Sequence, residues 1–262
     1  FRPYFMDILL YIAAGAAVGL IVGITGIGGG ALMTPLLLLF GFPPQVAVGT
    51  DLMYAGLTKA GGALSHHRQS HVRWAVVKRL AIGSIPAALL TGLSLRYLFE
   101  HPEHYSDLLR SALGIMLLLT AVVILCRGRI MQLTSKADST RWLPYRPAAT
   151  IAMGVFLGVF VTLSSVGAGA IGTAILMLLY PAFKSTNVVG TDIAHAVPLT
   201  LCAGLIHMYL GNVDFALLGA LLIGSLPAIH LGSCLSRHVP EQLLKTGLAS
   251  LLMALGAKYA FF

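Results

Sequence analysis

The sequence predicts an all-α polytopic membrane protein built from two homologous, inverted repeats, and three observations support this prediction. The 262-residue chain is 57% hydrophobic and only 10% charged, with a mean hydropathy of +0.87. Soluble domains, by comparison, carry about 25% charged residues. Several apolar runs reach the roughly 20 residues that a membrane-crossing helix needs. Distinctive motifs also occur twice at one fixed spacing, which indicates an internal duplication.

The duplication is clearest in two short motifs. "VGTDLMYA" at Val48–Ala55 returns as "VGTDIAHA" at Val189–Ala196, and "GSIPA" at Gly83–Ala87 returns as "GSLPA" at Gly224–Ala228. Both pairs are 141 residues apart. The same spacing relates the glycine-rich stretches that precede them, so the two halves are copies of one unit.

Each copy is expected to hold five helical elements. In chain order, the first and second copies place them at 4–22 and 148–165, 30–42 and 170–183, 46–66 and 187–210, 74–99 and 214–236, and 107–126 and 241–261. The second element is roughly 20 Å long as a helix, against about 30 Å of hydrocarbon, so it is expected to be a half-helix. The repeats then hold about 4–5 transmembrane segments each, short or broken ones included. They occupy 1–126 and 147–262 and are joined by a basic linker at 127–146.

The charge distribution predicts the orientation of these segments. The net charge is +8, but Lys and Arg gather in short loops between apolar runs, as the positive-inside rule describes, and nucleic acid is not an expected partner. With five crossings per copy, the loops on one side hold most Lys and Arg (66–73, 127–146 and 236–245), and those on the other hold most acidic loop residues (96–110 and 207–214). The linker is then cytoplasmic, and an odd number of crossings inverts the second copy.

The glycine-rich stretches fit a nucleotide motif but occur in the wrong setting for one. "TGIGGGA" at Thr25–Ala31 and "GAGAIG" at Gly167–Gly172 both match G-x-G-x-x-G/A. They follow apolar runs of membrane length, where a glycine break survives only if it is buried in protein or faces a water-filled cavity. Amides freed at a half-helix N-terminus form an anion site there. The alternative is that the glycines only let helices pack closely.

An oxyanion site needs N–H and O–H donors together with positive charge. The candidate amides are those of Gly26, Gly28, Gly29, Gly167 and Gly169. The candidate hydroxyls are those of Thr25, Thr50, Ser164, Ser165 and Thr191. Lys59 lies eight residues after Asp51, an offset of about 80° on a helix, so both can face one cavity. The alternative for Lys59 is that it snorkels to the membrane interface.

Asp51 and Asp192 are repeat mates, each directly after Gly-Thr. One interpretation is a helix cap, because a carboxylate is favoured at a helix start. The other is a proton carrier, or a second-shell residue that orients a donor, because intramembrane acids are costly. His195 lies three residues after Asp192 on the same helical face and is the candidate for pH-linked transport.

No metal or cofactor is expected from the sequence. The His and Cys residues lack the spacing of a zinc site. Cys126, Cys202 and Cys234 are expected to be small buried hydrophobic residues without a disulfide.

Longer motifs resemble those of a known family. "GITGIGGGALMTPLL", "AVGTDLMYAGLTKAGGALSHHRQSHVRW" and "GSIPAALLTG" in the first copy, with "VGTDIAHAVPL" and "GNVDFALLGALLIGSLPA" in the second, resemble the sulfite exporter TauE/SafE family of bacterial membrane permeases. The resemblance covers nearly the whole chain apart from 127–146. It implies an inner-membrane protein that moves sulfite, sulfonates or related sulfur oxyanions, mostly outward. The second copy departs from the glycine motif with Ser164-Ser165-Val166 ahead of Gly167.

The sequence therefore favours a secondary transporter that exports a small sulfur oxyanion by alternating access, either proton-linked or driven by the membrane potential. An anion channel and an importer of thiosulfate or sulfate remain as alternatives. A membrane enzyme is disfavoured, because no Ser-His-Asp order, metal cluster or nucleotide-binding lysine recurs. The expected partners are the anion and membrane lipid, and a homodimer is compatible with the sequence.

Overall fold

The computed structural model describes residues 2–25, 30–99, 102–136, 143–235 and 241–261, and their regular structure is helical throughout. All ten expected elements are confirmed. The first copy holds α1 (Arg2–Thr25), α2 (Gly30–Leu39), α3 (Pro44–Arg68), α4 (Trp74–Leu98) and α5 (Ser106–Lys136). The second holds α6 (Arg146–Ser164), α7 (Ala170–Leu179), α8 (Ser185–Tyr209), α9 (Phe215–Leu235) and α10 (Glu241–Phe261). Short 3-10 turns, η1 (Pro102–Tyr105) and η2 (Leu143–Tyr145), precede α5 and α6.

One boundary differs from the expectation. The apolar run was expected to end at 126, but α5 continues to Lys136. Residues 127–136 contain one glycine and no proline, so nothing in them stops a helix that has already formed. The first half of the basic linker is therefore a polar extension of α5.

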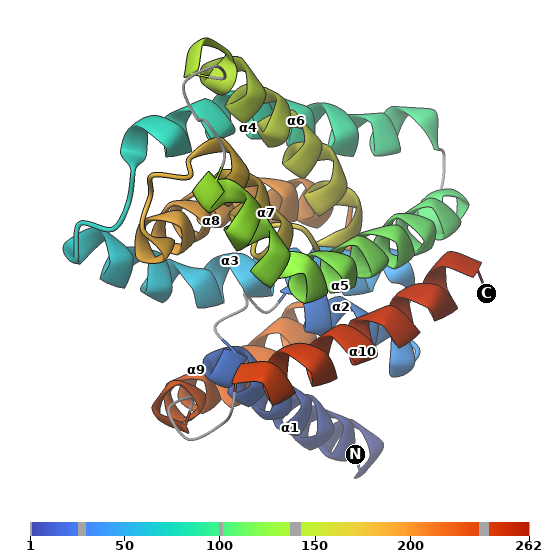
Figure 1. Ribbon diagram of the computed structural model, residues 1–262. Helices are drawn as coiled ribbons and strands as arrows, with labels where there is room; N and C mark the ends of the chain where they lie inside the picture. The colour runs from blue at the N-terminus through green and yellow to red at the C-terminus, as the bar shows by residue number, and fades with distance from the viewer. Residues whose placement is uncertain (1, 26–29, 100–101, 137–142, 236–240, 262) are drawn as a thin grey trace.

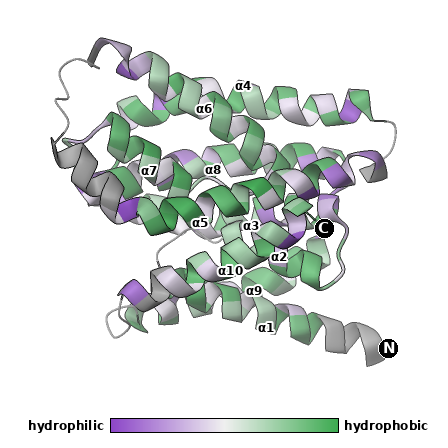
Figure 2. Cartoon of the chain, turned by 45° about the vertical axis from the view of Figure 1, so that its right-hand side comes forward, coloured by the Kyte–Doolittle hydropathy of each residue, from purple (hydrophilic) through white to green (hydrophobic). Residues whose placement is uncertain are grey.

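Six helical segments are long and apolar enough to cross a membrane: Ile8–Thr25, Trp74–Leu98, Ser106–Gly128, Arg146–Ser164, Ser185–Tyr209 and Phe215–Leu235. Shorter apolar helices lie at Ala170–Leu179 and Thr246–Phe261. α3 is as long as α8 but is not among the six, because polar residues, Asp51 and Lys59 among them, lower its mean hydropathy. Hydrophobic residues run along most of the helical length, as Figure 2 shows. The chain is a multi-pass membrane protein.

The outer surface is that of a protein in lipid. Large apolar side chains are exposed on several helices, among them Ile82, Leu90 and Ile223, each more than 60% exposed. The cysteines are free, but the expectation that all are buried is wrong: Cys234 is exposed, and Cys126 and Cys202 are half-buried. In a membrane protein an exposed thiol can still lie in an apolar environment, because the lipid provides one.

The long helices of each copy pack mainly against helices of the other copy. α1 runs along α9, and its repeat mate α6 runs along α4, while α3 packs against its own mate α8. In Figure 1 the α4–α6 pair lies at the top and α1 and α9 at the bottom, with α3 and α8 between them. α5 and α10 also pack together. This pattern is what a two-fold relation between the copies produces.

Glycines set the closest of these contacts. Gly83 on α4 lies against the backbone of Ile151, and its repeat mate Gly224 lies against Ile12, so close that a Cβ on either glycine would collide with a carbonyl oxygen. Ile151 and Ile12 are 139 residues apart rather than 141. The first helices of the two copies, α1 and α6, therefore correspond with a shift of two residues. The close glycine contacts repeat between the copies as the sequence motifs do.

Repeat mates run antiparallel where they touch. Gly56 of α3 lies beside Leu201 of α8, whereas Met53, earlier on α3, lies beside the later Gly204. α5 and α10 show the same reversal, since Gly114 meets Ala260 and Gly256 meets Leu118. Antiparallel mates are consistent with inverted repeats.

Candidate functional site

The glycine breaks separate α1 from α2 and α6 from α7. The first break lies outside the described residues, and with it Gly26, Gly28 and Gly29 of the predicted site. The second break, 165–169, follows α6. Gly167 and Gly169 have φ angles of 128° and 132°, which side-chain-bearing residues rarely adopt, so glycine is required at both positions. Ser165 ends α6 in the left-handed conformation, at φ 59°.

The break brings the start of α7 against Asp192. The Gly169 N–H faces the Asp192 carboxylate, and a Cβ at Gly172 would collide with the Asp192 Oδ1. Asp192 is 1% exposed. The N-terminal end of a helix carries partial positive charge, which stabilises a carboxylate held there. Asp192, from α8, thus occupies the anion position at the N-terminus of α7.

Asp51, the repeat mate of Asp192, binds the half-helix of the first copy. Its Oδ2 accepts hydrogen bonds from the N–H at 3.2 Å and the Oγ1 at 2.5 Å of Thr34, the fifth residue of α2. The Ser165 hydroxyl faces the same carboxylate from the second break. α3 begins at Pro44, seven residues before Asp51, so the interpretation of Asp51 as the cap of its own helix is wrong. It binds a different helix, α2, instead.

Each carboxylate keeps one oxygen free. Among the described residues, the Oδ1 atoms of both Asp51 and Asp192 are buried without a hydrogen-bond partner. A buried acceptor without a partner costs free energy, commonly about 1–3 kcal/mol. Such atoms are typical of a place where a ligand, water or proton completes the bonding.

Lys59 lies between the two carboxylates. It is 8% exposed, and its Nζ donates to the Ala168 carbonyl at 3.4 Å, so the snorkelling alternative is wrong. Within the described part of the chain, no carboxylate oxygen lies within 4.0 Å of this nitrogen. One peptide group connects Lys59 to Asp192: its carbonyl, on Ala168, faces Lys59, and its N–H, on Gly169, faces Asp192. The peptide dipole is favourable to both charges.

A second pair of repeat mates flanks the carboxylates one helical turn away. His195 is hydrogen-bonded through Nε2 to the Ser84 hydroxyl at 2.8 Å. Its mate Tyr54 faces Ser225, the mate of Ser84, without a hydrogen bond between their oxygens. The repeated "GS-x-PA" motif therefore supplies one serine to each half of the site. Neither serine was among the site residues predicted from the sequence, although their repetition in that motif was a usable signal.

Thr50 and Thr191 hold the copies together. The Thr50 Oγ1 accepts the N–H of Asp214 at 3.1 Å, and the Thr191 Oγ1 accepts the N–H of Arg73 at 3.0 Å. Each bond joins the Gly-Thr-Asp motif of one copy to the loop just before α9 or α4 of the other. We call these two bonds the threonine latches. Gly49, before Thr50, lies close against Asn212 of the same opposing loop.

Two other predicted hydroxyls bond to backbone. The Ser164 Oγ donates to the Phe160 carbonyl at 2.6 Å, and the Thr25 Oγ1 donates to the Ile21 carbonyl at 2.8 Å. The structure thus brings Asp51, Lys59, Ser165, Gly169, Asp192 and His195 around the second break, and the hydroxyls of Thr25, Thr50, Ser164 and Thr191 bond to backbone groups. Thr34, which was not predicted from the sequence, joins the first set, because only the folded chain places α2 beside Asp51. In the part of the chain that the structure describes, no three His, Cys, Asp or Glu side chains are grouped to hold a metal ion.

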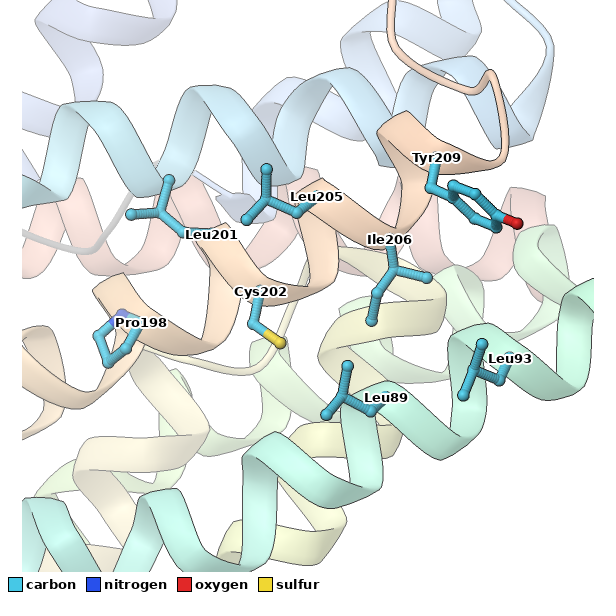
Figure 3. A pocket seen from close by; sticks show the side chains of 8 residues that line it. All are labelled: Leu89, Leu93, Pro198, Leu201, Cys202, Leu205, Ile206 and Tyr209. Atoms are coloured by element: carbon cyan, nitrogen blue, oxygen red, sulfur yellow. The ribbon is translucent and has the colours of Figure 1, made fainter.

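A separate groove of about 440 Å³ lies between α4 and α8. Figure 3 shows Leu89 and Leu93 of α4 across from Cys202 and Ile206 of α8. Its lining is apolar apart from a thiol and the Tyr209 hydroxyl, so it offers an oxyanion no charge and few donors. The candidate anion site is the polar set around the second break.

The comparison with known proteins agrees with this geometry. The sequence profile described as sulfite exporter TauE/SafE matches residues 11–259. The chain belongs to this family. The probable membrane transporter protein YjnA of Bacillus subtilis is 41% identical over 252 residues, covering 94% of this chain and 97% of that relative. The probable membrane transporter protein MJ0441 of Methanocaldococcus jannaschii is 26% identical, covering 94% and 93%. No solved structure matches the chain.

Membership in the TauE/SafE family makes the chain a membrane transporter rather than an enzyme. The resemblance read from the two copies of the motifs is confirmed over nearly the full length. The identity of the transported molecule is a separate question, which the chemistry of the site addresses.

Proposed function

We propose that this transporter is a secondary carrier that exports a small sulfur oxyanion, sulfite or an organosulfonate, by alternating access. The observation that carries the proposal is a buried lysine that acts on two buried carboxylates, one held at the N-terminus of the half-helix α7 and one bound to Thr34 of the half-helix α2. Positions that hold a carboxylate suit another oxyanion of similar size and charge. The family name supplies the sulfur oxyanion as the substrate class.

Lys59 supplies the attraction for the anion. In the low-dielectric interior a cation acts on a nearby anion far more strongly than in water. The donors around it are the Thr34 N–H and hydroxyl, the Ser165 hydroxyl and the Gly169 N–H. These donors lie on both copies, so an anion among them contacts both halves of the protein.

The antiparallel mates support the alternating-access part of the proposal. Inverted repeats that swap conformations open a central site to one side and then to the other. The threonine latches are the matching contacts that such an exchange would break and re-form, one in each half. On this proposal the protein lies in the bacterial inner membrane with the 127–146 linker in the cytoplasm. If the protein forms a homodimer, each chain would still contain a complete anion site of its own.

The experiment is uptake of labelled sulfite into proteoliposomes, with sulfate, thiosulfate and methanesulfonate as competitors. Wild-type protein is expected to give saturable flux that rises when sulfite is preloaded on the opposite side, as a carrier does and a channel does not. Lys59→Met is expected to lower the flux at least tenfold, whereas the exposed control Lys78→Met leaves it unchanged. Flux that neither saturates nor responds to preloading contradicts the carrier, and thiosulfate or sulfate moving in place of sulfite contradicts the substrate.

A further inference from the structure

The buried charges of the site do not balance. Asp51, Lys59 and Asp192 are all buried, and together they carry two negative charges and one positive charge when ionised. Lys59 and Asp192 are joined through the Ala168–Gly169 peptide and offset each other. Asp51 is the remaining charge, and only neutral donors bind it directly: the N–H and hydroxyl of Thr34, with the Ser165 hydroxyl facing it.

The surroundings of Asp51 hold few other ionisable groups. On its own helix, Tyr54 and Lys59 act on it electrostatically. α2 contributes Thr34, and the second break contributes Ser165. On α8, His195 faces Lys59 and is bonded to Ser84. A substrate anion bound to Thr34 would therefore compete with Asp51 for the same donors and would place a second negative charge among them, which burial makes costly.

We propose that Asp51 is a built-in anion bound to Thr34 of α2, and that the substrate displaces it only together with one proton. This inference rests on the proposed anion transport. The proton comes from the aqueous phase to which the site is open and binds the free Oδ1 of Asp51. The neutral carboxyl then releases the Thr34 donors to a substrate oxygen. On the opposite side the anion leaves, the proton passes to water and the Asp51 carboxylate recovers Thr34.

The number of protons carried with each anion follows from the difference in charge between the two copies. Asp192 keeps its charge because Lys59 faces it through one peptide, and Lys59 has Thr200 as its repeat mate. One proton therefore accompanies each anion, and for a monoanion no net charge crosses the membrane. The direction of transport then follows the combined anion and proton gradients, not the membrane potential.

The test uses methanesulfonate, which stays a monoanion around neutral pH, so that any coupled proton is carried by the protein. Proteoliposomes are given a pH gradient while potassium and valinomycin clamp the potential. Wild-type protein is expected to accumulate the sulfonate about tenfold per pH unit, whatever the clamped potential. Accumulation that follows the potential and ignores pH overturns the inference and leaves the transport proposal standing. About hundredfold accumulation per pH unit overturns the one-proton count. If wild-type protein moves neither sulfite nor sulfonate, the proposed function itself fails.

A variant assigns the proton to Asp51. Asp51→Asn imitates the neutral acid, because its oxygen can accept from Thr34 while its NH₂ takes the place of the protonated Oδ1. It is expected to keep sulfonate exchange between the two sides and to lose pH-driven accumulation, with the ratio falling to about one when the potential is clamped at zero. The exposed control Asp107→Asn keeps both. Retained pH-driven accumulation in Asp51→Asn overturns the assignment, and the wild-type measurement decides the coupling even if this variant does not fold.

Discussion

The two halves of the site share one backbone frame and differ in charge. In both copies a long helix carries Gly-Thr-Asp, the Asp contacts the half-helix of its own copy, and a serine from "GS-x-PA" faces the next turn. The first copy adds Lys59, where the second has Thr200. The comparison shows that the residues repeated in both copies make the backbone contacts of the site. The charge that would select an anion, that of Lys59, comes from the first copy alone.

Each residue of the Gly-Thr-Asp motif has a separate role in this frame. Gly49 lets the opposing loop approach, Thr50 accepts a backbone N–H from that loop, and Asp51 binds Thr34 of α2. Thr200, by contrast, bonds its own helix at the Ala196 carbonyl and adds no charge. The repeated motifs are therefore architectural, and the unmatched positions carry the specificity.

The largest expected difference between the two copies is seen when the two aspartates are neutralised one at a time. Asp192→Asn is expected to lower the free energy of unfolding by about 3–5 kcal/mol, because Lys59 loses the charge that offsets it. Asp51→Asn is expected to cost about 1 kcal/mol or less, because its donors are neutral. Denaturant unfolding of the purified variants measures both. The double variant Lys59→Met/Asp192→Asn should recover part of the loss, and equal costs at the two aspartates would show that Lys59 is not paired with Asp192.

A smaller effect is expected from Gly172→Ala. The added Cβ collides with the Asp192 Oδ1, so about 1–3 kcal/mol of stability is lost, and sulfite flux falls at least tenfold as the carboxylate is displaced. Gly219→Ala is the matched control, since a Cβ there meets nothing within 4 Å in a helix of the same copy. Thermal unfolding and flux are measured on both. Unchanged flux in Gly172→Ala would place the Asp192 carboxylate outside the site.

The threonine latches test whether the two copies are energetically equivalent at positions where their residues are the same. Thr50→Val and Thr191→Val each leave one backbone N–H without its acceptor, which is expected to cost about 1–2 kcal/mol. The two losses should match within about 0.5 kcal/mol, because the bonds are related by the repeat. The measurement is the unfolding midpoint in detergent. A loss in one variant only would show that the latches are not equivalent.

The smallest expected difference lies between the two serines. Ser84→Ala removes the hydrogen bond to the His195 Nε2 and is expected to cost about 1 kcal/mol. Ser225→Ala removes no hydrogen bond within the described residues and is expected to be close to neutral. Equal costs in the same unfolding assay would mean that Ser225 and Tyr54 are bonded as their mates are.

Much of the fold could be predicted from the sequence because its signals are local. Apolar run length, proline positions and the 141-residue spacing locate all ten helices, and α5 outlasts its apolar run because helix propensity continues where hydrophobicity stops. The site could be predicted only in part. The sequence singled out Asp51, Asp192 and Lys59, but the partners of the aspartates are on other helices. That Asp51 binds Thr34 of α2, and that one peptide joins Lys59 to Asp192, follows from tertiary packing alone.

The most direct test of the central claim is calorimetric titration of the purified protein with sulfite, comparing wild type, Lys59→Met and the exposed control Lys78→Met. If the polar set around the second break is the anion site, wild type and Lys78→Met bind one sulfite per chain with similar affinity. Lys59→Met then binds at least about tenfold more weakly, a loss of about 1.4 kcal/mol or more. Equal binding by Lys59→Met and wild type would contradict the account, because the anion site would then lie away from the one cation buried between the two half-helices of the described chain.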